Sequence, residues 1–175
     1  MSTTHSKVEQ DALALLTAGS RAIEQLGRAF ARRPNTADRV ETGKLALRVC
    51  HALGVHAAIK EEVFYPAAEA VLAPERQELV AVSRRDQDEI GHLVEAVERT
   101  PADDPGFDAA FEAVLERTHR LAEREEKDLF PALRHSGLDL AGTGERMAAR
   151  RAQLATRPVD RETIASARRV MGGRP

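Results

Sequence analysis

Five polar residues interrupt the apolar faces of segments that otherwise have the periodicity of amphipathic helices. They are Ser20, His56, Lys60, Gln87 and Glu125. A polar group that faces a core costs free energy unless it has a partner, so these residues need one another or a ligand. His and carboxylate side chains are metal ligands, whereas a buried Lys can act as a base or as the cation of an ion pair.

The five residues fall near the middle of four predicted helices, which places them at one height in an antiparallel bundle. We therefore expect a single central polar layer. Within it, we expect a buried ion pair between Lys60 and Glu125, bridged by His56, Gln87 and Ser20. Removing one partner of such a pair costs about 3–5 kcal/mol, because the other charge is left buried alone.

The elements that position this layer are predicted from a 3.6-residue apolar period, which recurs along the chain without a strand-like alternation. Aromatic residues are 3% of the sequence and Trp is absent, which also favours an all-α fold over a β-sandwich. We expect an antiparallel up-down-up-down four-helix bundle with a short fifth C-terminal helix. The predicted helices cover residues 8–32, 38–72, 74–100, 107–135 and 140–154. Pro66 should bend or shorten the end of the second helix.

One domain, residues 8–155, is predicted, followed by a flexible or loosely docked tail, residues 156–175. The domain contains an internal repeat. The segment before Pro66 aligns with the segment before Pro131, each with a Glu-Glu pair and an aromatic-Pro-Ala end, at an offset of 131 − 66 = 65 residues. The bundle should thus consist of two similar helical hairpins.

Several stretches together resemble the bacterial hemerythrin-like family, the HHE cation-binding domain. The resemblance spans roughly residues 11–154. It rests on the run Asp11-Ala-Leu-Ala-Leu-Leu, on the two repeat segments that end at Pro66 and Pro131, and on the segments 136–140 and 145–150. It implies a helical bundle with a non-haem di-iron site, in a family associated with oxygen binding, iron or redox sensing and peroxide handling.

The family pattern implies a His on the first helix, His-x-x-x-Glu on the second, a His on the third and His-x-x-x-Glu on the fourth. The residues at those six positions here are Ser20, His56, Lys60, Gln87, Leu121 and Glu125. Two of six ligands remain, and a lysine brings a competing positive charge. We therefore expect no cofactor and no metal in the central layer.

Composition narrows the remaining function classes. The formal net charge is −2, so no overall basic field favours nucleic acid. No stretch is long and apolar enough for a membrane span. The single cysteine, Cys50, forms no internal disulfide, and the first residues lack a signal-peptide pattern, so a cytoplasmic location is expected.

The leading hypothesis is a degenerate hemerythrin-like scaffold without enzymatic activity, whose partner is an unknown small polar ligand or protein. One alternative is a non-haem iron protein for oxygen, redox or iron response, with a remodelled site formed by His56, Glu125 and Glu61. The other is an enzyme that uses buried Lys60 as an acid or base, which needs a cavity open to solvent beside this residue.

Overall fold

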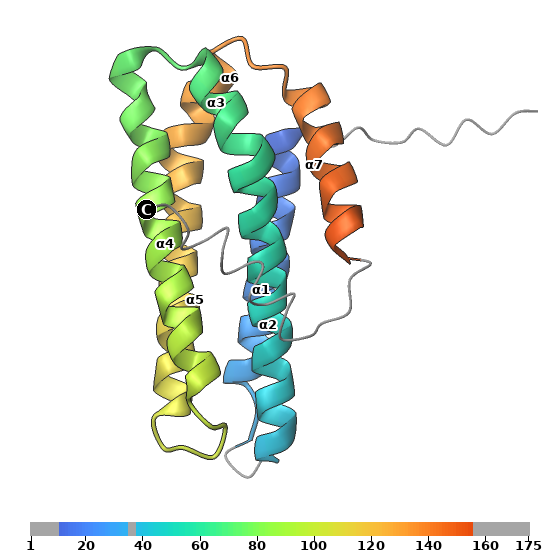
Figure 1. Ribbon diagram of the computed structural model, residues 1–175, viewed down its shortest axis with the longest axis vertical. Helices are drawn as coiled ribbons and strands as arrows, with labels where there is room; N and C mark the ends of the chain where they lie inside the picture. The colour runs from blue at the N-terminus through green and yellow to red at the C-terminus, as the bar shows by residue number, and fades with distance from the viewer. Residues whose placement is uncertain (1–10, 35–37, 156–175) are drawn as a thin grey trace, which may run out of the picture.

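The computed structural model describes residues 11–34 and 38–155, and within these ranges every regular element is helical. The predicted tail, residues 156–175, lies outside them. Four long helical segments form the bundle, and a fifth helix packs on its outside (Figure 1). The elements are α1 (Ala12–Ala31), α2 (Arg39–Ile59), η1 (Lys60–Phe64), α3 (Tyr65–Val71), η2 (Pro74–Arg76), α4 (Gln77–Arg99), α5 (Phe107–Arg124), η3 (Glu125–Leu129), α6 (Phe130–Arg134) and α7 (Leu140–Ala155).

The bundle is antiparallel, as predicted. The chain runs down α1, up α2, η1 and α3, down α4, and up α5, η3 and α6 (Figure 1). Two helix starts are fixed by side-chain caps: Asp11 accepts a hydrogen bond from the Ala14 N–H at 2.8 Å, and Asp38 accepts one from the Val40 N–H at 2.8 Å. The last helix of the described residues, α7, lies against α1, α2 and η1.

The two long helical segments that contain Pro66 and Pro131 continue past these prolines, and each has a π-helical turn just before its proline. The π-helical segment η1 precedes Pro66, and η3 precedes Pro131. Proline lacks an N–H and crowds the carbonyl four residues earlier, and a π turn relieves both problems by changing the hydrogen-bond register. The helical segments thus run to Val71, in agreement with the helix predicted over residues 38–72, and Pro66 does not cut the helix short.

Buried apolar side chains form two clusters, one toward each end of the bundle. Along α1 one cluster ends at Leu16 and the other begins at Ile23; along α5 and η3 the change falls between Leu121 and Leu129. Ser20 and Glu125 lie in these gaps. The polar layer therefore separates two apolar halves, which is the arrangement that the interrupted periodicity predicts.

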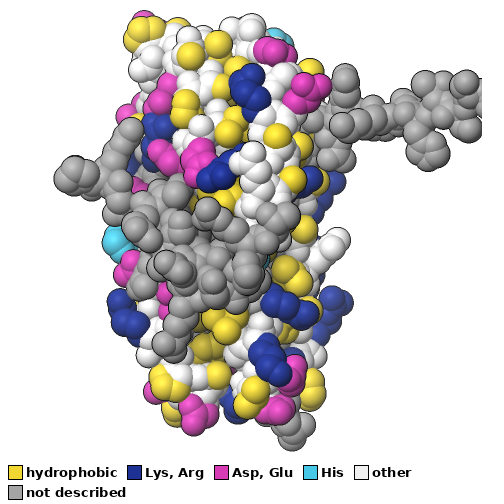
Figure 2. All heavy atoms as spheres, turned by 45° about the vertical axis from the view of Figure 1, so that its right-hand side comes forward, with side chains coloured by type: hydrophobic (Ala, Val, Ile, Leu, Met, Phe, Trp, Pro, Cys, Tyr) yellow, Lys and Arg dark blue, Asp and Glu magenta, His cyan; other side chains and the backbone are white. Residues whose placement is uncertain are grey.

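On the face shown in Figure 2, Lys and Arg side chains are interspersed with Asp and Glu over the described residues. No described helix combines the length and the apolar character needed to cross a lipid bilayer.

Candidate functional site

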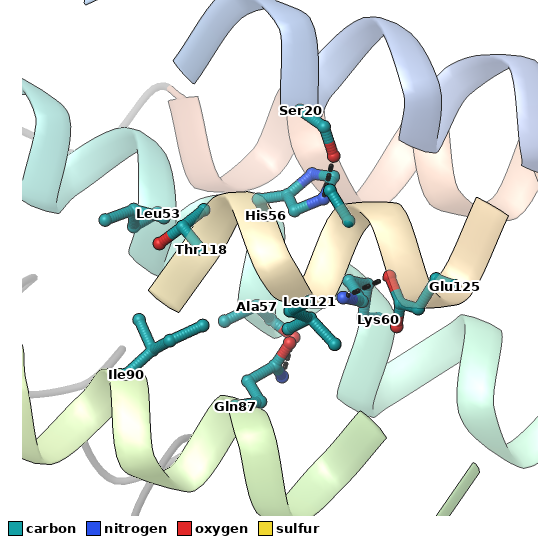
Figure 3. A pocket seen from close by; sticks show the side chains of 11 residues that line it. Ser20, Leu53, His56, Ala57, Lys60, Gln87, Ile90, Thr118, Leu121 and Glu125 are labelled. Carbon is teal, nitrogen blue, oxygen red and sulfur yellow. Dashed lines mark hydrogen bonds and ion pairs between the residues drawn. The ribbon is translucent and has the colours of Figure 1, made fainter. Parts of the chain in front are cut away.

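Lys60 and Glu125 meet in the middle of the bundle. The Lys60 Nζ atom lies 2.8 Å from Glu125 Oε2, and the two residues are 1% and 2% exposed. Figure 3 shows the pair, and the helical segments that carry it, η1 and η3, come from opposite halves of the internal repeat. At this distance and burial the contact is a charge-assisted hydrogen bond between two desolvated groups.

Tyr65 is the other direct partner of Glu125, and the periodicity of the sequence did not reveal it. Its hydroxyl donates to Glu125 Oε1 at 2.7 Å and also hydrogen-bonds with Ser83. Burial, followed by the negative charge of Glu125, raises the pKa of Tyr65 well above its usual value, so the phenol stays neutral and donates. Both carboxylate oxygens of Glu125 are thus satisfied, one by Lys60 and one by Tyr65.

The π turn explains why Tyr65 reaches this position. The Tyr65 N–H hydrogen-bonds to the carbonyl of Lys60, five residues earlier, and Phe130 makes the same bond to Glu125. In a regular α-helix the residues that share a face with Lys60 are three or four positions away, so the α-helical period does not place Tyr65, five positions away, on that face. The available signal was the aromatic residue directly before a proline in both halves of the repeat.

The other three predicted members of the layer make different contacts from those expected. Ser20 Oγ lies 3.5 Å from His56 Nε2, and Gln87 Nε2 donates to the backbone carbonyl of Ala57 at 3.3 Å (Figure 3). They surround the ion pair but do not bridge it. That part of the prediction is wrong, because Tyr65 already occupies the free oxygen of Glu125.

His56 is held as a neutral imidazole. Burial first, then the positive charges of Lys60 and Arg151, lower its pKa from 6.5 to about 3. The ring also packs against the backbone of α1, since a Cβ atom at Gly19 would lie only 2.7 Å from His56 Nδ1. His56 therefore fills the layer as a neutral group next to a lysine.

The layer lines a small pocket of about 20 Å³, formed by Ser20, Leu53, His56, Ala57, Lys60, Gln87, Ile90, Thr118, Leu121, Ala122 and Glu125 (Figure 3). A volume of roughly 10–15 Å³ is enough for one water molecule. The space beside Lys60 is therefore the size of a water molecule and too small for an organic substrate.

Glu61, the third residue of the hypothetical remodelled metal site, contacts a different group. Its Oε2 atom lies 3.0 Å from Nε of Arg84, which also binds Glu69. Sequence reasoning also missed Asp86, which is 4% exposed and pairs with Arg117 at 2.7 Å and with Arg124 at 2.5 Å. These ion pairs join neighbouring helical segments around the layer.

Comparison with known proteins decides the family. A model of the hemerythrin HHE cation-binding domain matches residues 5–133. This chain belongs to the hemerythrin HHE family. Its structure is also similar to the crystal structure of a hemerythrin HHE cation-binding domain-containing protein from Mycobacterium kansasii, with a TM-score of 0.72 and 24% identity over 90% of this chain and 98% of the other. That likeness supports the fold. A search of curated proteins found no match.

The residues of this hemerythrin domain do not fit the di-iron centre that its family implies. Within the described residues, no group of three or more His, Cys, Asp and Glu side chains is placed to hold a metal ion. The donors left in the layer are His56 and Glu125, and one oxygen of Glu125 is bound by the Lys60 ammonium. A dication here would have to displace an ammonium that is already paired.

Proposed function

We propose that this hemerythrin domain is a metal-free scaffold that acts by binding a partner, with the Lys60 ammonium in the place that relatives give to cations. The observation that carries the proposal is the buried 2.8 Å ion pair between Lys60 and Glu125. An ammonium supplies positive charge beside the carboxylate without any need for the missing ligands. The charges in the layer are then balanced within the protein itself.

The size of the central cavity supports a partner that binds elsewhere. A cavity of about 20 Å³ leaves room for a water molecule beside Lys60, not for a small organic ligand. The same volume disfavours acid-base catalysis by Lys60, since a substrate could not approach it. A protein partner that contacts the outer surface is the better match, and the free cysteine, Cys50, supports a cytoplasmic setting for it.

Metal analysis of the purified protein tests the proposal. The wild-type protein, prepared without chelators, should contain well under one iron, manganese or zinc ion per chain and lack oxo-bridged iron absorption. The positive control is Lys60→Glu, which places a carboxylate one turn after His56 and opposite Glu125. Three donors would then share one layer, and this variant should bind a divalent ion.

Lys127→Glu is the matched control, because it makes the same charge change at an exposed lysine in the other π turn. It should remain as metal-free as the wild type. Stoichiometric metal in the wild-type protein would overturn the proposal and favour the alternative, a remodelled non-haem iron site.

A further inference from the structure

The large apolar side chains that stay exposed among the described residues both lie in the first half of α2. Val40 is 63% exposed and Leu47 is 44% exposed, and because they are seven residues apart they share one face of the helix. Leu47 also borders a cavity of about 180 Å³ between α2, the end of α4 and the start of α5. We call this surface, formed by Val40, Leu47, Ala46, Val97 and Ala102, the α2–α4 groove. Exposed apolar surface of this kind marks a place where another segment or protein docks.

The second half of α2 is covered by α7. This helix packs on α2 and η1 and runs toward the start of α2 (Figure 1). Nη2 of Arg150 donates to Oε1 of Glu62 at 3.1 Å, and the nearby Ala58 and Ile59 are 3% and 1% exposed. The last residue of α7, Ala155, therefore points the chain toward the groove, and twenty residues of the sequence follow it.

The sequence after α7 has the pattern of an amphipathic helix. Ile164, Ala167 and Met171 stand at i, i+3 and i+7, the spacing of residues on one helical face. Pro158 precedes them and Gly172 follows them, as at the two ends of a helix. A helix that lies in an apolar groove is anchored by residues with this spacing, so the segment is suited to the groove.

The anchors are equally spaced on the two surfaces. Ile164 and Met171 are seven residues apart, as are Leu47 and Val40, and at about 1.5 Å per residue each pair spans roughly 10 Å along a helix. A helix that continues in the direction of α7 would set Ile164 beside Leu47 and Met171 beside Val40. An apolar cavity of about 150 Å³ holds a benzene-sized molecule, so the one beside Leu47 has room for a branched aliphatic side chain.

Charge favours the same segment. Residues 156–175 contain five arginines and two acidic residues. The loop that contributes Ala102 to the groove also carries Asp103 and Asp104, and both are exposed. Attraction between exposed charges is weak for each pair, so it orients the segment while the apolar contacts hold it.

We propose that residues 156–175 of this chain fold back onto the α2–α4 groove, with Ile164, Ala167 and Met171 on its apolar surface. The chain's own tail is favoured over a separate protein because it is tethered at Ala155, which gives it an effective concentration of about the millimolar range. Weak apolar contacts are then sufficient to keep the groove covered. The site is separate from the central polar layer and does not depend on its metal content.

Paramagnetic relaxation in the full chain tests the proposal. A nitroxide label is attached at Ser166→Cys, which lies off the proposed contact face, in a Cys50→Ala background that removes the other thiol. The methyl signals of Val40 and Leu47 should lose most of their intensity relative to the reduced label. Leu13, in the apolar cluster at the other end of the bundle, should keep its intensity.

Two alanines of the tail provide matched variants of the labelled chain. Ala167→Asp places a charge on the proposed contact face and should restore the Leu47 signal. Ala165→Asp makes the same change on the other side of the predicted helix and should leave the signal broadened. Neither substitution alters a residue of the bundle, so both variants test docking in the same folded core.

Three results would overturn the proposal. One is a Leu47 signal that the label leaves undiminished, and another is an equal effect of the two aspartate variants. The third is broadening of Leu47 in isotope-labelled chains without a nitroxide when they are mixed with nitroxide-labelled chains. That result would mean that the groove is occupied by a second copy of the chain.

Discussion

The two π turns have the same backbone conformation, but they begin with side chains of opposite charge. Residues 60–64 and 125–129 occupy equivalent places in the internal repeat, each directly before an aromatic residue and a proline. The first position of one turn is Lys60 and that of the other is Glu125, and they form an ion pair across the bundle axis. A duplicated backbone has therefore placed two opposite charges face to face.

The differences continue on either side of the pair. One half of the repeat has His56 and Tyr65, whereas the other has Leu121 and Phe130 at the same places. Tyr65 contacts the Glu125 carboxylate through its hydroxyl, and Phe130, its counterpart in the other half, has no hydroxyl. The layer is therefore asymmetric, because both direct partners of the Glu125 carboxylate, the Lys60 ammonium and the Tyr65 hydroxyl, come from the first half of the repeat.

The largest expected effect comes from removing the cation of the pair. Lys60→Met leaves Glu125 buried at 2% exposure without its counterion, and should lower the free energy of unfolding by about 3–5 kcal/mol. Chemical denaturation followed by circular dichroism measures the loss. Lys127→Met is the matched control, because Lys127 is an exposed lysine of the other π turn, and it should change stability by less than about 0.5 kcal/mol.

Removing the hydroxyl that distinguishes Tyr65 from Phe130 should have the next largest effect. Tyr65→Phe makes the two halves alike at this position and leaves Glu125 Oε1 without its donor. A lost hydrogen bond to a charged group costs about 1.5–3 kcal/mol, which denaturation should detect. In a Lys60→Met, Glu125→Leu background, the same substitution should cost much less. Equal losses in both backgrounds would show that Tyr65 acts only through packing.

His56 should make the protein less stable in mild acid. Its pKa is about 3 when folded and about 6.5 when unfolded, so between these pH values only the unfolded chain takes up the proton. Stability is therefore lost as the pH falls from about 6.5 toward 3, and His56 should contribute about 1–2 kcal/mol of loss between pH 7.5 and 5. His56→Leu, which copies Leu121, should remove this part of the pH dependence. An unchanged stability profile would contradict an imidazole that stays neutral in the folded protein.

Ser20→Ala should have the smallest effect. The Ser20 hydroxyl and His56 Nε2 are 3.5 Å apart at a partly exposed position, which is the outer limit of a hydrogen bond. The expected loss is below about 1 kcal/mol by denaturation. A loss as large as that of Tyr65→Phe would mean that Ser20 supports the ion pair directly, as we first expected from the sequence.

The fold and the central pair could be predicted because both depend on helical periodicity. Polar residues that break an apolar face at mid-helix must meet in an antiparallel bundle, and opposite charges among them pair. The same reasoning failed for Tyr65, because the π turn changes the period just where the site is built. It also failed for the bridging roles of Ser20 and Gln87, since side-chain direction within a layer depends on contacts that spacing does not give.

Glu61 shows another limit of the sequence pattern. Its place next to Lys60 made it a reasonable third metal ligand, but it lies beside Arg84, whose position on α4 could not be related to η1 from spacing alone. A cavity of about 180 Å³ between the first half of α2, the end of α4 and the start of α5 could not be predicted either, because its lining comes from three separate segments. Periodicity within one helix can be recognised in the sequence, but contacts between different helices can be identified only in the folded structure.

A double-mutant cycle on Lys60 and Glu125 tests the central claim most directly. Unfolding free energies would be measured for the wild type, Lys60→Met, Glu125→Leu and the double variant. If the ammonium and the carboxylate neutralise each other, the double variant should be far more stable than Lys60→Met alone, which leaves the carboxylate unpaired. Losses that simply add would contradict the account, because they would mean that the two charges are stabilised independently.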